Sequence, residues 1–130
     1  MNEHEAKRLF SVLAWATRYH TIPNTVSDQS GQSLSCVGFV SRSEIRISIG
    51  NIFVSVDRDR HHGIIGNPKS QSNYGQTNDG ARLEFNLNED NQIITGCVLS
   101  GGPDGEIEVS VSAAKAVVQL AGTSTEFLFS

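Results

Sequence analysis

Hydrophobic and polar positions alternate with a period of two between Ser43 and Asp57, which predicts a pair of β-strands. The stretch reads SEIRISIGNIFVSVD, and Gly50-Asn51 at its centre is typical of a two-residue hairpin turn. Pairing across this turn places apolar residues opposite one another on one face: Ile49 with Ile52, Ile47 with Val54, and Ile45 with Val56. The other face pairs Ser48 with Phe53, Arg46 with Ser55, and Glu44 with Asp57. A slip of one residue would reverse both faces, so the pattern specifies the register.

A helical period of apolar positions precedes this hairpin. Asn2 and Glu5 have the spacing of a capping box, and Pro23 follows the predicted helix. The apolar stripe consists of Leu9, Phe10, Val12, Leu13, Trp15, Ala16 and Tyr19. The opposite face, which we expect to meet solvent, is marked by Lys7, Ser11 and Arg18. A polar link over residues 24–33 and a strand in LSCVGFV complete this half of the chain.

Strand patterns resume in RLEFNLN, which places Leu83, Phe85 and Leu87 inward. A three-residue turn over residues 89–91 predicts a return strand paired as follows: Leu87 with Ile93, Phe85 with Thr95, and Leu83 with Cys97. EIEVSVS then predicts a strand with Ile107, Val109 and Val111 inward.

The C-terminal region allows two interpretations. In the first, SAAKAVVQLAG forms a short helix over residues 112–122 and TEFLFS forms a terminal strand. In the second, one helical seam begins at residue 106 and runs through Ile107, Val111, Ala114, Val118, Ala121 and Leu128. The β-branched residues of EIEVSVS favour the first interpretation.

The predicted class is therefore α+β: an N-terminal helix, an antiparallel meandering sheet of about six strands, and a short C-terminal helix, with both helices on one face of the sheet. A length of 130 residues without repeats predicts a single domain over residues 1–130. Residues 58–81 are rich in Gly, Asn, Ser and Gln and show no period, so they are predicted to form a long polar loop.

Composition excludes several classes of function. The net charge is −4 and no basic stripe is visible, which argues against binding to nucleic acid. No apolar stretch approaches the length of a membrane span and no signal peptide is visible, so we expect a cytoplasmic protein that does not bind membranes. Cys36 and Cys97 fall in predicted strands, where we expect reduced core thiols; the alternative is an interstrand disulfide, which needs an oxidising compartment.

The segment GIIGNPKS resembles a phosphate-binding loop, with Gly63, Lys69 and Ser70 in matching positions. Pro68, however, replaces the second glycine of that motif and has no N–H to donate to a phosphate. No helical pattern follows to aim its N-terminus at the phosphate. A nucleotide site is therefore not predicted.

The segment DRDRHH, just before it, contains Asp57, Arg58, Asp59, Arg60, His61 and His62. In an extended chain Asp57, Asp59 and His61 would point the same way, and such a set can hold a transition metal or act as acid and base. The interleaved arginines can instead pair with the carboxylates. Mixed charges of this kind are typical of a solvated rim or of a surface that contacts a partner.

The order of the first elements, a helix followed by three antiparallel strands over residues 4–57, resembles that of type III secretion chaperones, which are small, acidic, cytosolic α+β proteins. That family places a helix after the third strand, where it helps to build a dimer. Here GIIGNPKSQSNYGQTNDG occupies this position. The resemblance therefore implies an architecture and carries no site residues across.

We expect a non-enzymatic protein-binding module without a cofactor, of the immunity, inhibitor, anti-defence or secretion-chaperone kind, that acts through its sheet and the 58–81 loop. The expected contact residues are Asp57, Arg58, Asp59, Arg60, His61, His62 and the loop aromatic Tyr74. One alternative is a small metal-assisted hydrolase or ligand-binding enzyme centred on Asp57, Asp59, His61 and His62. The other is a structural subunit of a homo-oligomeric assembly, such as a homodimer.

Overall fold

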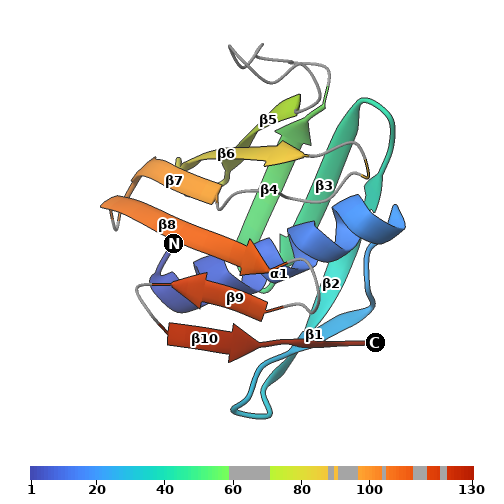
Figure 1. Cartoon of the computed structure of the whole chain (residues 1–130), viewed down its shortest axis with the longest axis vertical. Helices are drawn as coiled ribbons and strands as arrows, with labels where there is room; N and C mark the ends of the chain where they lie inside the picture. Colours follow the sequence, from blue (N-terminus) through green and yellow to red (C-terminus); the bar gives the residue numbers. More distant parts are fainter. Residues whose placement is uncertain (59–70, 88–89, 91–96, 104, 113–116, 121–122) are drawn as a thin grey trace.

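The computed structural model describes residues 1–58, 71–87, 90, 97–103, 105–112, 117–120 and 123–130 (Figure 1). Helix α1 spans Glu3–Tyr19. The strands assigned in these residues are β1 Thr25–Ser27, β2 Ser33–Val40, β3 Glu44–Ile49, β4 Ile52–Asp57, β5 Gln71–Thr77, β6 Arg82–Leu87, β7 Cys97–Gly102, β8 Gly105–Ser112, β9 Val117–Leu120, β10 Thr123–Glu126 and β11 Leu128–Phe129. They form one antiparallel sheet in the order β10-β9-β8-β7-β6-β5-β4-β3-β2-β1-β11. The α+β class is thus confirmed, but the sheet is larger than the six strands expected.

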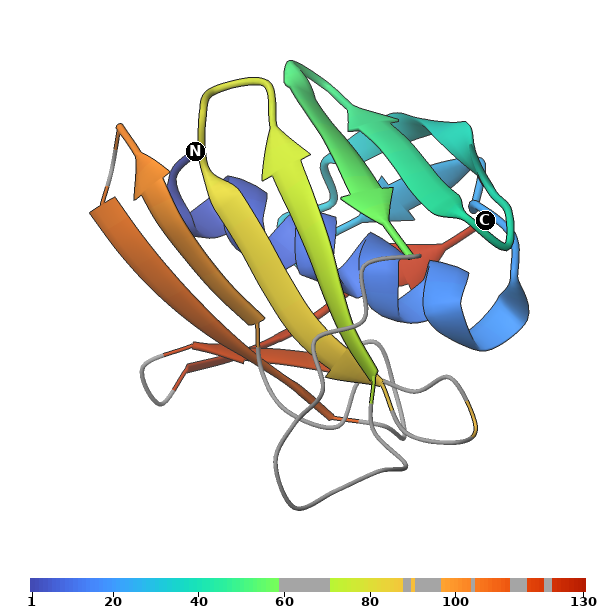
Figure 2. The same cartoon turned by 90° about the horizontal axis from the view of Figure 1, so that it is seen from above.

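The sheet curls around α1 and its two ends meet. Strand β10 pairs with β9 at one end of the order, and β11 pairs with β1 at the other end. Only Phe127, whose side chain is buried, separates β10 from β11 along the chain. Figure 2 shows strands on several sides of the helix, and α1 packs against β3, β8 and β9. The prediction of helices on one face of a sheet is therefore wrong, because the sheet wraps around a central helix.

The burial of α1 follows from this wrapping. Every residue from Ala6 to Leu13 is buried, which covers more than two helical turns and hence every direction around the axis. Lys7 and Ser11, expected on a solvent face, are 8% and 0% exposed. Ser11 Oγ donates a hydrogen bond to the backbone carbonyl of Arg8 at 2.7 Å, which satisfies the buried hydroxyl. The predicted Asn2–Glu5 capping box is confirmed, with Asn2 Oδ1 accepting from Glu5 N at 2.8 Å.

The central hairpin is confirmed in register. All six predicted pairs between β3 and β4 are formed, from Glu44 opposite Asp57 to Ile49 opposite Ile52. The apolar set faces α1 and is buried: Ile45, Ile47, Ile49, Ile52, Val54 and Val56. Leu83, Phe85 and Leu87 of β6 are also buried, as predicted. The face of these strands that points toward α1 is called the inner face below, and the opposite one the outer face.

The second hairpin has a longer connection than predicted. Leu83 lies opposite Leu99 and not opposite Cys97, so β7 is displaced by two residues. A displacement of two preserves which side chains point inward. The hydrophobic pattern therefore does not fix the length of the turn or the register of this pair of strands.

Three further predictions are wrong in the described residues. Val117–Leu120, assigned to a short C-terminal helix, form β9 between β8 and β10, which also excludes one long helix from residue 106. The predicted strands at EIEVSVS and at the C-terminal segment are confirmed as β8, β10 and β11. The polar loop 58–81 contains β5, and the polar link 24–33 contains β1. Residues 59–70 of that loop lie outside the described residues.

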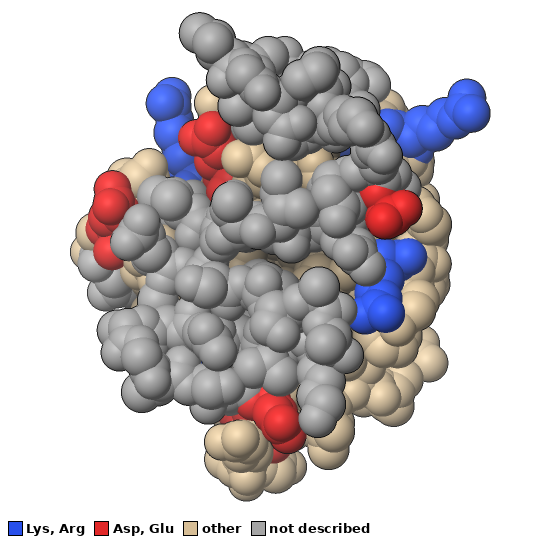
Figure 3. Space-filling model, in the orientation of Figure 1, with Lys and Arg blue, Asp and Glu red and all other residues tan. Residues whose placement is uncertain are grey.

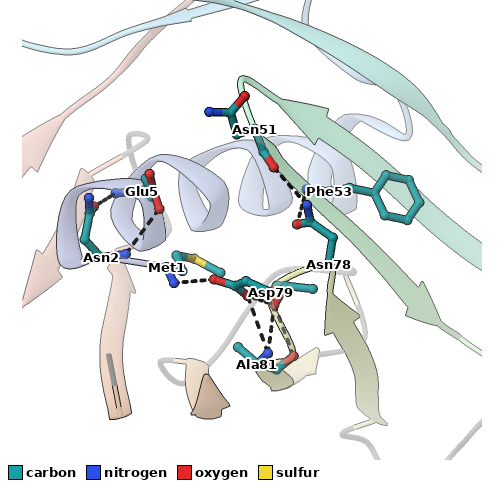
Figure 4. Close-up of polar contacts among 9 residues, drawn as sticks. Met1, Asn2, Glu5, Asn51, Phe53, Asn78, Asp79 and Ala81 are labelled. Atoms are coloured by element: carbon teal, nitrogen blue, oxygen red, sulfur yellow. Dashed lines mark hydrogen bonds and ion pairs between the residues drawn. The ribbon is translucent and has the colours of Figure 1, made fainter. Parts of the chain in front are cut away.

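A polar turn between β5 and β6 contacts both the β3–β4 hairpin and the N-terminus of the chain (Figure 4). The Asn78 side chain accepts from Phe53 N and donates to Asn51 O, both at 2.9 Å, which ties this turn to the β3–β4 hairpin. The Met1 amino group contacts the carboxylate of Asp79. Burial raises the pKa of Asp79, but hydrogen bonds from that amino group, the Thr77 hydroxyl and the backbone N–H of Ala81 outweigh burial and hold the pKa below its ordinary value.

Replacing Asn78 by alanine removes both of these hydrogen bonds. We expect the free energy of unfolding to fall by about 1–2 kcal/mol in a urea titration. Asn78→Asp keeps the acceptor for Phe53 N and loses the donor to Asn51 O, so its loss should be smaller. Gln76→Ala, at an exposed neighbouring position, serves as the neutral control. Equal stability of Asn78→Ala and the wild type would show that the side chain does not tie the two turns together.

Candidate partner-binding surface

The structure places three of the residues predicted to contact a partner. Asp57 ends β4, Arg58 follows it, and Tyr74 lies in β5 directly opposite Asp57. Tyr74 is thus part of the sheet and half-buried, and is not in a loop. The other four predicted residues, Asp59, Arg60, His61 and His62, lie outside the described residues.

Arg58 is held by the turn between β2 and β3. Its Nη1 donates to the Ser41 carbonyl at 2.9 Å, and its backbone N–H donates to the Ser43 carbonyl at 2.8 Å. The guanidinium therefore links the end of β4 to the turn between β2 and β3. The sequence gives no sign of this, because the acceptors are backbone atoms distant along the chain.

Asp57 and Tyr74 belong to a row of side chains that crosses four strands on the outer face. Cross-strand pairing places Glu44 of β3 opposite Asp57, Asp57 opposite Tyr74, and Tyr74 opposite Glu84 of β6. Directly opposed Cβ atoms in such pairs lie about 5 Å apart. We call Glu44, Asp57, Tyr74 and Glu84 the acidic row. Glu84 is exposed and the other three are half-buried.

The row beside it on the outer face carries two arginines. Arg46 of β3 and Arg82 of β6 lie in line with Ser55 and Gln76. Arg46 Nε donates to Glu44 Oε2 at 3.0 Å, which couples the two rows. Its guanidinium carbon also lies over the aromatic ring of Phe39 on β2, 5.9 Å from the ring centroid, which is within range of a cation–π contact.

Exposed apolar side chains occupy the far end of the same face. Val37 of β2 and Phe53 of β4 flank Ser48, and they are 68% and 38% exposed. The outer face therefore changes from apolar at the Gly50 turn to acidic at the end where β4 leads into residues 59–70. Figure 3, in the orientation of Figure 1, shows a different side of the molecule, on which the visible lysine and arginine side chains stand apart from one another with acidic ones between them.

A second polar cluster joins α1 to the turn between β1 and β2. Arg8 Nη2 lies 2.8 Å from His4 Nε2 and 3.3 Å from Asp28 Oδ2, and that oxygen lies 2.9 Å from His4 Nε2. The side chains of Asp28 and Arg8 are 2% and 7% exposed. Arg8 Nε is buried without a hydrogen-bond partner in the described part of the chain. The sequence did not predict this cluster, because the polar composition of residues 24–33 indicated a solvent-exposed link and therefore a solvated Asp28.

Hydrogen bonds hold Asp28 ionised. The largest influence on its pKa is the hydrogen bond from the Ser30 hydroxyl, which lowers it, while burial acts in the opposite direction. The backbone N–H of Ser30, which donates to Asp28 Oδ1 at 3.0 Å, and the charges of His4 and Arg8 lower the pKa further. A buried carboxylate so surrounded anchors the turn to the helix.

Cys36 of β2 is a free, buried thiol, as predicted. Burial raises its pKa to about 11, against the opposing influence of the Arg8 charge. The thiol is therefore protonated at neutral pH and is a core residue, because a nucleophilic or metal-binding cysteine needs the thiolate. The side chain of Cys97 lies outside the described residues.

Among the residues that the structure describes, no three His, Cys, Asp or Glu side chains gather as metal ligands. The metal-assisted alternative depends on Asp59, His61 and His62, which lie outside them, so it stays a prediction. The one described helix is neither long nor apolar enough to cross a membrane.

The chain matches no known family model, no curated protein and no solved structure. Its function is therefore inferred from the chemistry of its own surface.

Proposed function

We propose that the protein is a non-enzymatic, protein-binding module of the cytoplasm and that the acidic row is its contact surface. The observation that supports this is the direct opposition of Glu44 and Asp57, with Glu84 on the far side of Tyr74. Although Arg46 pairs with Glu44, two carboxylates directly opposed across a sheet are an arrangement that sheet stability alone does not favour. Residue arrangements that do not favour the stability of a fold are expected at functional sites.

The chemistry of the row suits a basic partner. Carboxylates on a rigid sheet attract lysine and arginine side chains and speed association, which makes binding sensitive to salt. Tyr74 supplies an aromatic anchor of the kind enriched at the energetic centres of interfaces. The remaining predicted contacts, Asp59, Arg60, His61 and His62, follow Arg58 in the sequence and lie outside the described residues. An immunity protein or inhibitor with a basic target fits this surface best among the classes expected from the sequence.

Comparative affinity capture from cells that express the chain tests this proposal. The row variant carries Tyr74→Ser and Glu84→Gln, and the matched control carries Tyr19→Ser and Glu126→Gln, which removes the same residue types from exposed positions elsewhere. We expect one protein with a basic surface to be enriched by the wild type and the control and to fall about tenfold with the row variant. It should elute as salt is raised. Equal recovery by all three proteins would contradict the proposal.

A further inference from the structure

Half of strand β2 has no neighbour on one side in the described residues. It pairs with β3 along Cys36–Val40, but with β1 only along Ser33–Ser35. The last backbone hydrogen bond on the β1 side runs from Cys36 N to Asn24 O at 2.8 Å. We call Val37–Val40 the free half of β2.

The direction of the unused backbone groups follows from two hydrogen bonds. Ser41 N donates to Glu44 O across the β2–β3 ladder, while Cys36 N donates to the other side. Backbone groups alternate in direction along a strand, so those of Gly38 and Val40 point away from β3. Neither residue has a backbone hydrogen bond on that side within the described part of the chain.

The free half also lacks the devices that usually protect a sheet edge. Monomeric proteins place charged residues or proline on exposed strands to prevent pairing with other chains. Strand β2 reads SLSCVGFV and contains neither. Instead, Val37 and Phe39 are 68% and 46% exposed beside the unused groups.

We propose that a second copy of this chain pairs antiparallel with the free half and forms a twofold-symmetric dimer. The unused N–H and C=O groups require an extended backbone as their partner. One antiparallel register pairs both Gly38 and Val40 of each copy with free groups of the other, whereas a shift toward Cys36 would use an N–H that is already engaged. In that register Gly38 lies opposite Val40 of the second copy, and Phe39 lies opposite Phe39. The uncharged strand allows this approach although each chain carries a net charge of −4.

This dimer is independent of the proposed function. Pairing adds a strand of the second copy beside the free half of β2, and the acidic row on β3–β6 stays accessible on each copy. A dimer would therefore present two such rows. A variant that no longer dimerises can still be tested for partner binding, and a variant that no longer binds the partner can still be tested for dimerisation.

Sedimentation of three purified full-length proteins tests the dimer. The wild type is expected to sediment with twice the mass of one chain. Phe39→Lys sets two like charges opposite each other across the twofold axis and is expected to sediment as a single chain. Phe53→Lys is the matched control: the same change on the same face, at 38% exposure, two strands from the free half. A single-chain mass for the wild type, a dimeric Phe39→Lys, or a single-chain Phe53→Lys would each overturn the proposal.

A cysteine cross-link tests the register if Phe39→Lys fails to fold. Residues opposed in a non-hydrogen-bonded antiparallel pair lie close enough for a disulfide. Phe39→Cys is therefore expected to form a covalent dimer under mild oxidation, above the background of the wild type. Ser48→Cys, on the same face of β3, should not. Equal yields from the two variants would contradict the predicted register.

Discussion

Replacing Gly38 by alanine is expected to lower the free energy of unfolding by about 3 kcal/mol, or to prevent folding altogether. Gly38 has a φ of 157°, and a Cβ atom there would lie 1.9 Å from the carbonyl oxygen of Arg46 and 2.8 Å from its carbonyl carbon. Both atoms belong to the backbone of the adjacent strand and cannot turn away as a side chain could. The two strands would have to separate at this position.

Gly31→Ala is the control for this variant. Gly31 has a φ of 82°, but no atom lies within 4 Å of its added Cβ. Alanine at this position should cost only the strain of a left-handed backbone, about 1 kcal/mol. Chemical denaturation of both variants separates strain from collision. If Gly38→Ala were no less stable than Gly31→Ala, the close approach of β2 to Arg46 would be refuted.

Replacing Asp28 by alanine is the second change with a large expected effect, a loss of about 3 kcal/mol. The variant leaves Arg8 buried without its counter-ion, and Ser30 loses its acceptor at the turn. Replacing the arginine as well should recover part of the loss. We therefore expect Arg8→Met to cost much less in the Asp28→Ala background than in the wild type, with an interaction energy of about 1–2 kcal/mol in a double-mutant cycle. Additive losses would show that the pair is not coupled.

The same carboxylate gives the stability a defined dependence on pH. The pKa of Asp28 is lower in the folded protein than its ordinary value of 3.8. Its contribution is therefore fully present above pH 3.8 and is lost as the pH falls through the folded-state pKa. Asp28→Asn should flatten this acid limb in part, and Asp79, whose pKa is also lowered, supplies a remaining slope of the same sign.

The parts of the fold that could be predicted are those in which one local pattern decides the outcome. Alternation on both sides of Gly50-Asn51 determined all pairs of the central hairpin, since a two-residue turn leaves no freedom in register. The β6–β7 pairing lacks such a turn, and its register differed by two residues from the prediction. The capping box was predictable because it involves only Asn2 and residues within three positions of it.

The parts that could not be predicted depend on distant contacts. Closure of the sheet around α1 buries Lys7 and Ser11. The hydrophobic period of the helix alone cannot reveal this burial. The C-terminal segment has alanines and valines suited to a helix, but pairing of Val117–Leu120 with two neighbouring strands overrides that propensity. Asn73 and Gly75 in β5 occupy inner positions that alternation cannot reveal, so a strand was mistaken for a loop.

The candidate surface was partly visible in the sequence. The hairpin register already opposed Glu44 to Asp57, and Tyr74 was singled out as an aromatic in a polar stretch. Their union in one row required β5, which places Tyr74 between Asp57 and Glu84. The buried pair of Arg8 and Asp28 was missed because its members are twenty residues apart and Asp28 falls within a predicted polar link.

The most direct test of the central claim is a calorimetric titration of the captured partner against wild type and a neutral row variant. That variant carries Glu44→Gln, Asp57→Asn and Glu84→Gln, which keeps the size of each side chain and removes its charge. We expect its affinity to be at least about tenfold weaker, with a reduced dependence on salt. Equal affinity and equal salt dependence of the two proteins would contradict the assignment of the acidic row as the contact surface.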